Sequence, residues 1–240
     1  MNGKIPPSEI DEICESLIVD YLKKTNQTDI ECIDIEGFLI DYLKYELVNE
    51  TIAEDDPNKV AFTADGITPL KIRKGREIIS RIYPANTVVI DKFFLRPDLS
   101  GVRRFTIGHE CGHIVKERMY EKKCCASFYR DKRFVDTIPG GEFQMYFKME
   151  ESQCDSFSAG FLMPRFLIDK TIGMFHSGSK LPIYGTCVLK SREKKAVKRM
   201  ADSLGVSFSA LFYRLRHFNL FETHDMNEFC EELGFGGDYQ

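Results

Sequence analysis

The chain of 240 residues lacks the features that mark secreted and membrane proteins. No apolar run approaches the roughly 18 residues that a membrane-spanning helix needs. The N-terminal segment has no basic stretch followed by an apolar stretch and a small-residue cleavage site, so it does not resemble a secretory signal. These absences predict a cytoplasmic protein that has no membrane partner.

Positive charge is also scarce over the chain as a whole. The 33 Lys and Arg residues are outnumbered by 37 Asp and Glu residues, and the formal net charge is -4. A nucleic-acid surface that extends over the whole protein is therefore excluded, and any basic patch must be local. The eight cysteines include no CxxC pair, which argues against a structural zinc knuckle and favours free thiols in a reducing cytosol.

The patterns that are present change along the chain and indicate an α+β fold. Apolar residues at helical spacing predict an amphipathic helix over residues 10–22, and a second helix over residues 32–48 that runs on toward a strand. Between residues 60 and 91, the pieces KVAFTA, PLKIRK and NTVVID predict a small antiparallel sheet. Helical spacing returns at residues 105–115 and again from residue 150.

One stretch within the third of these helices carries the residues expected for catalysis. RRFTIGHECGH, residues 103–113, ends in two histidines four apart. Positions i and i+4 share one face of a helix, so His109 and His113 can point two imidazoles at one zinc ion. Glu110 follows the first histidine, where its carboxylate can reach a metal-bound water as a general base. Gly112 permits another helix or backbone to approach closely.

Two histidines leave a zinc ion under-coordinated, and the helix that begins near residue 150 is the best source of a third ligand. Glu151 and Asp155 are four apart in EESQCDSF, so both can face the histidine helix. Glu151 is predicted as the third ligand. Asp155 is predicted to orient a ligand histidine through its other ring nitrogen. Glu150 competes for the ligand position, and all three acids could instead lie at a solvated helix N-terminus.

Together, RRFTIGHECGH and EESQCDSFSAGFLMP resemble the ImmA/IrrE family of bacterial metallopeptidases. The family pattern is an Arg-Phe-Thr segment that runs into HExGH, followed by a glutamate helix that closes on Leu-Met-Pro. The resemblance covers about residues 50–170 and implies a zincin-like core. It implies a zinc site made by His109, His113 and Glu151, with Glu110 as the catalytic acid/base. It also implies a protein substrate, of the class of helix-turn-helix transcriptional repressors.

The last part of the chain differs in composition. Between Lys190 and His217, eight basic residues stand against two acidic ones, a local net charge of +6. MADSLGVSFSALFYRLRHFNL has the layout of a helix-turn-helix, with its turn at residues 205–207. We therefore expect a metallopeptidase domain over residues 1–175 and a helical, helix-turn-helix-like segment over residues 190–240.

Two interpretations of this basic tail remain open. One places Arg214, Arg216 and His217 against DNA. The other, which we favour, is a packed helical subdomain that supports the catalytic core or binds a protein, because phenylalanines are interleaved with the basic residues.

The leading hypothesis is a zinc-dependent endopeptidase that acts on a protein. The alternative is a DNA- or protein-binding transcriptional regulator whose metal site is sensory or degenerate. Glu110 favours the enzyme, since a purely structural or sensing site needs no proton acceptor there. Tyr129, Tyr146 and His176 are candidates for polarising the scissile carbonyl. Cys111, inside the motif, and Cys124 and Cys125, in the loop that follows it, could add redox control or bind the metal.

Overall fold

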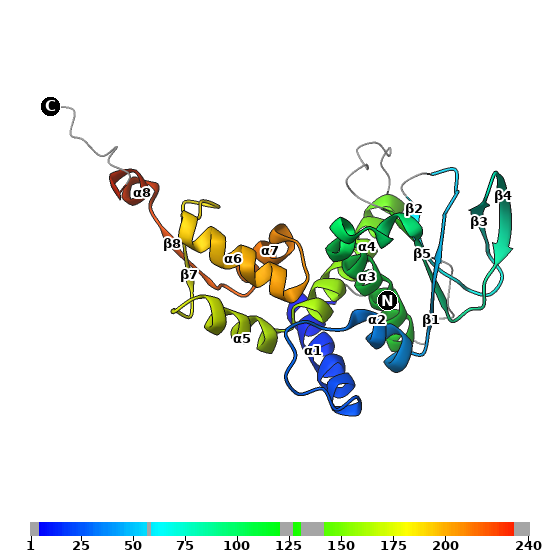
Figure 1. Cartoon of the computed structure of the whole chain (residues 1–240), viewed down its shortest axis with the longest axis horizontal. Helices are drawn as coiled ribbons and strands as arrows, with labels where there is room; N and C mark the ends of the chain where they lie inside the picture. The colour runs from blue at the N-terminus through cyan, green and yellow to red at the C-terminus, as the bar shows by residue number, and fades with distance from the viewer. Residues whose placement is uncertain (1–4, 57–58, 121–126, 131–141, 233–240) are drawn as a thin grey trace. The chain divides into compact units, whose positions relative to one another are not determined.

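The computed structural model divides the chain into two units, Met1–Pro164 and Arg165–Gln240 (Figure 1). The described residues are 5–56, 59–120, 127–130 and 142–232. The first unit combines helices with a mixed sheet, so the predicted α+β class is confirmed. Among the described residues, no helix has both the length and the apolar character needed to cross a membrane.

The first unit begins with the amphipathic helix that the sequence predicts, α1 (Pro7–Lys24). The predicted second helix is shorter than expected and changes its geometry. It consists of α2 (Ile35–Gly37), which begins where the Asp34 side chain accepts a hydrogen bond from the Gly37 backbone, and of the π-helical turn η1 (Phe38–Tyr42). Lys44 then takes a positive φ of 63°, and the chain leaves the helical conformation for strand β1.

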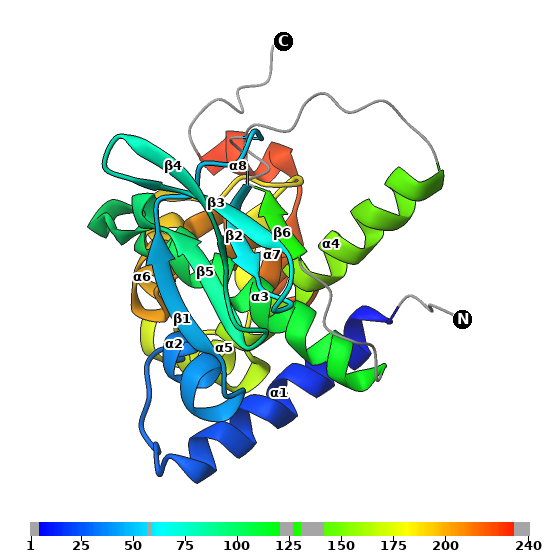
Figure 2. The same cartoon turned by 90° about the vertical axis from the view of Figure 1, so that its right-hand side faces the viewer.

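The central sheet has four strands in the order β1-β5-β2-β6 (Figure 2). β2 pairs antiparallel with both β5 and β6, but β1 and β5 run parallel. The predicted antiparallel pairing of KVAFTA with NTVVID is confirmed in β2 and β5, but the sheet is mixed, because β1, which is distant in sequence, adds a parallel strand beside β5. The strands are β1 (Glu46–Glu50), β2 (Lys59–Thr63), β5 (Thr87–Asp91) and β6 (Ser127–Arg130).

PLKIRK does not join this sheet as a neighbouring strand. It forms β3 (Pro69–Lys74), which makes a hairpin with β4 (Glu77–Ile82). The turn between them contains Gly75, whose φ of +62° suits a residue without a side chain. The hairpin contributes Leu70 and Ile72 to a buried cluster with Phe62 and Ala64.

Two long helices of the first unit, α3 (Ser100–Met119) and α4 (Glu142–Leu162), pack against each other. α3 also packs against β2, on the face of the sheet opposite Phe62 and Ala64. Two short 3-10 turns, η2 (Lys92–Leu95) and η3 (Pro97–Leu99), connect β5 to α3. The HExxH-type segment therefore lies on a long helix that is held between the sheet and α4.

The second unit is mainly helical and contains a two-stranded parallel sheet that the sequence pattern did not predict. Its helix α5 packs against α6, so the structure divides at Pro164 and not at residue 175, where we expected the first domain to end. Its elements are α5 (Arg165–Phe175), β7 (Leu181–Tyr184), α6 (Ser191–Leu204), α7 (Phe208–His217), β8 (Phe221–His224) and α8 (Met226–Glu232).

Candidate metal centre

Two glycines allow α3 and α4 to approach closely. A Cβ atom added to Gly112 would lie 2.9 Å from the Cβ of Phe157, and one added to Gly108 would lie 2.6 Å from the Oγ of Ser158. The Ser158 hydroxyl also donates a hydrogen bond of 2.7 Å to the Phe105 carbonyl. The close approach predicted for Gly112 is confirmed. Gly108 was missed, although it lies four residues earlier on the same helix face.

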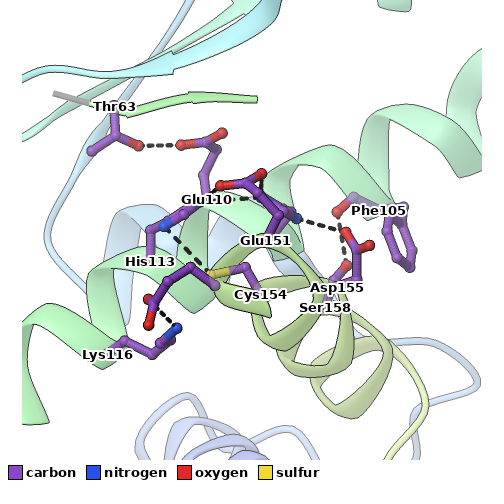
Figure 3. Close-up of polar contacts among 11 residues, drawn as sticks. Thr63, Phe105, Glu110, His113, Lys116, Glu151, Cys154, Asp155 and Ser158 are labelled. Atoms are coloured by element: carbon purple, nitrogen blue, oxygen red, sulfur yellow. Dashed lines mark hydrogen bonds and ion pairs between the residues drawn. The ribbon is translucent and has the colours of Figure 1, made fainter. Parts of the chain in front are cut away.

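This close packing brings two histidines of α3 against a carboxylate of α4 (Figure 3). The Nε2 atoms of His109 and His113 are 3.1 Å apart. The Glu151 carboxylate places one oxygen 3.3 Å from Nε2 of His109 and the other 3.4 Å from Nε2 of His113. The structure thus brings together the three residues that we predicted as ligands, and His109 is fully buried.

The other ring nitrogen of each histidine faces one of two consecutive residues of α4. Nδ1 of His109 lies 2.8 Å from Oδ1 of Asp155, as we expected. Because an ionised carboxylate only accepts hydrogen bonds, this contact assigns the proton to Nδ1 and leaves the Nε2 lone pair for an ion. Nδ1 of His113 lies 3.4 Å from the sulfur of Cys154, a contact that we did not predict.

His109, His113 and Cys154 form a group that could hold a metal ion, since their ligand atoms lie within 4.8 Å of one another. The sulfur of Cys154 faces Nδ1 of His113, whereas Glu151 faces Nε2 of the same ring. The histidines therefore belong to two alternative donor sets, one completed by a thiol and the other by a carboxylate. We favour the carboxylate set, because both Nε2 atoms and both Glu151 oxygens converge in it.

Glu150, the competing candidate for a ligand, pairs with a lysine of α3. Its Oε2 atom lies 2.6 Å from Nζ of Lys116, whose side chain is almost completely buried. A buried ammonium requires a partner of opposite charge. The ion pair therefore gives Glu150 a structural explanation that does not involve the histidines.

Glu110 is completely buried, and its two carboxylate oxygens differ. Oε2 accepts a hydrogen bond from the hydroxyl of Thr63 on β2. Oε1 has no hydrogen-bond partner among the described residues. Burial raises the pKa of Glu110, although the two neighbouring histidines lower it in part. A buried carboxylate oxygen without a partner costs free energy, so it indicates a group that acts on something not present in the chain itself.

The charges around the histidines favour a cation. Burial alone would lower the pKa of His109, but hydrogen bonds to Asp155 and Glu151 outweigh it and the pKa is raised. The pKa of His113 is also raised against the effect of burial, by Cys154 and Glu151. Burial alone would raise the pKa of Glu151, yet the contacts with the two histidines hold it at about 2. An environment that stabilises protonated histidines stabilises a bound metal cation for the same electrostatic reason.

The other residues that the sequence suggested are the candidates for polarising the scissile carbonyl and the cysteines of the motif region. The side chains of Tyr129 and Tyr146, and the residues Cys124 and Cys125, lie outside the part of the chain that the structure describes. His176 belongs to the second unit, where its Nε2 lies 2.9 Å from the Lys180 carbonyl oxygen. Cys111 is fully buried and burial raises its pKa, which disfavours the reactive thiolate that redox control would need.

The predicted helix-turn-helix corresponds to α6 and α7 of the second unit. Gly205 ends α6 with a φ of +64°, and the hydroxyl of Ser207 accepts a hydrogen bond from the Ala210 backbone at the start of α7. Arg214 is only 6% exposed, and its guanidinium lies 4.2 Å from the centre of the Phe218 ring. This burial against Phe218 favours a packing role for Arg214 over the DNA contact that the first interpretation gave it.

No family model matches the chain, and no curated protein matches it. A Mycobacterium tuberculosis transcriptional regulator of known structure is similar with a TM-score of 0.47 and 12% identity, over 87% of this chain and 46% of that one. The chain thus spans less than half the length of that regulator, and a similarity of this size supports no conclusion about function. The resemblance to ImmA/IrrE peptidases is not confirmed. Fold and site define a mixed α+β protein with a buried His/His/Cys group that could hold a metal ion.

Proposed function

We propose that the protein is a zinc-dependent endopeptidase. The observation that carries the proposal is the convergence of three groups beside a buried base. Two imidazole Nε2 atoms and the Glu151 carboxylate lie within 3.1 to 3.4 Å of one another. The next residue after His109 is Glu110, whose Oε1 has no partner among the residues that the structure describes. A set of two histidines and a glutamate is the donor set of a hydrolytic zinc site, and it leaves one position of a tetrahedral ion for water.

The residues of the chain take separate roles in this proposal. His109, His113 and Glu151 would hold the ion, which when bound lowers the pKa of a coordinated water to about 7 and polarises a carbonyl. Glu110 would accept the proton of the attacking water and return it to the leaving amine. Asp155 would keep His109 in the tautomer whose Nε2 is free. Cys154 would hold the ring of His113 in place from the opposite nitrogen.

The substrate class rests on sequence resemblance alone. We infer a protein substrate, with a helix-turn-helix repressor as the first candidate, because the ImmA/IrrE-like motifs imply it. The C-terminal α6 and α7 support a second candidate function, that of a DNA- or protein-binding regulator whose metal site acts as a sensor. The exposed basic residues of α6 favour this second candidate: Arg192, Lys194, Lys195, Lys198 and Arg199.

Glu110→Gln separates the two functions. The amide keeps the size of the side chain but cannot act as a base, so we expect the variant to retain its metal and to lose hydrolysis of candidate repressors. General base catalysis typically contributes about 10²- to 10⁴-fold, and a loss in that range is expected. The measurements are metal analysis of the purified proteins and cleavage assays by mass spectrometry. Equal cleavage by the parent and Glu110→Gln would contradict the peptidase mechanism.

A further inference from the structure

The two oxygens of the Glu110 carboxylate have different surroundings, and the difference comes from one residue of the sheet. The Thr63 hydroxyl donates its hydrogen bond to Oε2, whereas Oε1 has no partner among the residues described (Figure 3). Glu110 is completely buried and Thr63 is 1% exposed, so water does not compete freely for this bond. A hydrogen bond to a charged group in such surroundings is stronger than one at the surface.

The strand geometry explains why Thr63 is in this position. Side chains alternate between the two faces of a strand, so Phe62 and Ala64 point to one face of β2 and Thr63 to the other. Phe62 and Ala64 are part of the buried apolar cluster beneath the hairpin β3–β4. Thr63 therefore faces α3, and β2 is fixed on both sides by pairing with β5 and β6. The hydroxyl group is thus held by the rigid sheet and not by the helix that carries Glu110.

We propose that Thr63 is a positioning residue that fixes the Glu110 carboxylate and leaves Oε1 as the oxygen that exchanges protons. This inference rests on the proposed peptidase function. A glutamate side chain has three rotatable bonds, and its base function requires one oxygen at hydrogen-bond distance from the attacking water. A bond from the sheet to Oε2 removes most of this rotational freedom before substrate arrives. Thr63 acts only through Glu110 and takes no part in the proton transfer.

The chain offers a matched control for this residue. Thr87 is also fully buried, on the neighbouring strand β5, and its hydroxyl oxygen has no hydrogen-bond partner in the described part of the chain. Thr63 pairs with Val88, so the adjacent Thr87 points to the opposite face of the sheet. Thr63→Val and Thr87→Val therefore make the same chemical change at equal burial, and only the first removes a hydrogen bond to Glu110.

Difference infrared spectroscopy reads the contact without any substrate. The carboxyl bands of Glu110 are identified by subtracting the spectrum of Glu110→Gln from that of the parent. We expect Thr63→Val to shift these bands, Thr63→Ser to restore them because it keeps the hydroxyl, and Thr87→Val to leave them unchanged. Thr63→Ala replaces Thr63→Val if the latter does not fold. Bands that stay in place when the Thr63 hydroxyl is removed, in whichever of these two variants folds, overturn the proposal, whatever the activity.

The kinetic test uses one internally quenched peptide, the one that the parent cleaves fastest out of a peptide pool, as the probe and metal analysis as the check on the site. In the zinc-loaded proteins we expect Thr63→Val to lower kcat by about 10- to 100-fold with KM and zinc content unchanged, and Thr63→Ser to recover most of the rate. Shifted bands with an unchanged kcat would overturn the positioning role. If the parent itself cleaves neither peptides nor repressors, the proposed function fails, and the infrared bands still decide whether Thr63 holds Glu110.

Discussion

Each of the two units contains a pair of packed helices, α3 and α4 in the first and α6 and α7 in the second. The two pairs differ in the polarity of the side chains between their helices. Between α3 and α4 lie buried and half-buried histidines and carboxylates and a buried thiol, brought together by Gly108 and Gly112. Between α6 and α7 the buried side chains are mainly apolar, and the turn is fixed by Gly205 and Ser207. Apolar burial stabilises a fold directly, whereas burial of polar groups costs free energy unless they have partners. The pair α3–α4 contains such a group without a partner among the described residues, Oε1 of Glu110, and is therefore better explained by a function than by stability.

The largest expected effect concerns Glu151, the carboxylate of α4 that faces His109 and His113. Glu151→Ala removes a proposed ligand, and we expect zinc affinity to fall by about 100-fold or more, above the range for groups that only support a ligand. Glu150→Ala is the matched control from the preceding position. It leaves the buried ammonium of Lys116 without its partner, so it should lower the unfolding temperature but keep zinc. If Glu150→Ala lost zinc and Glu151→Ala did not, the third ligand would be assigned to Glu150.

A smaller effect is expected from filling the close contact between α3 and α4. Gly112→Ala places a methyl group against Phe157 and the backbone of Cys154, which should lower the free energy of unfolding by about 1 to 3 kcal/mol and weaken metal binding. Gly173→Ala, on α5 of the other unit, meets nothing within 4 Å and should stabilise by about 0.5 to 1 kcal/mol. Denaturant unfolding with zinc titration measures both. A neutral Gly112→Ala would show that the two helices can separate without disturbing the site.

The smallest of these effects concerns the thiol beside His113. Cys154→Ala removes the partner of Nδ1, and we expect zinc affinity to fall by about 10-fold, because groups that orient a ligand histidine contribute about 10- to 100-fold and sulfur is a weak partner. Cys154→Ser should recover part of the loss. Cys111→Ala, at an equally buried position of α3, is the control and should cost stability without loss of zinc. A loss as large as that of Glu151→Ala would indicate that Cys154 binds the metal itself.

The sequence predicts those residues of the site whose relative positions follow from the period of the α-helix. His109 and His113 share a helix face at a spacing of four, and so do Glu151 and Asp155, so their geometry follows from the helix alone. The first helix and the helix-turn-helix layout were likewise predictable from apolar spacing and from the turn at Gly205.

The features that were missed depend on contacts between distant segments. Thr63 is 47 residues from Glu110, and only the packing of α3 on β2 brings the two together. The parallel pairing of β1 with β5 and of β7 with β8 joins strands that are far apart in sequence, which local alternation of side chains does not encode. Cys154 could have been noticed, since it lies three residues after Glu151 and can share its helix face.

X-ray absorption at the zinc edge of the purified, metal-loaded protein tests the central claim most directly. We expect about one zinc ion per chain, surrounded by nitrogen and oxygen at about 2.0 to 2.2 Å, with no sulfur neighbour. This result would assign the ion to His109, His113 and Glu151, with a position left for water. A sulfur neighbour at about 2.3 Å would assign it instead to the set that contains Cys154. A protein that takes up no zinc at all would contradict the account.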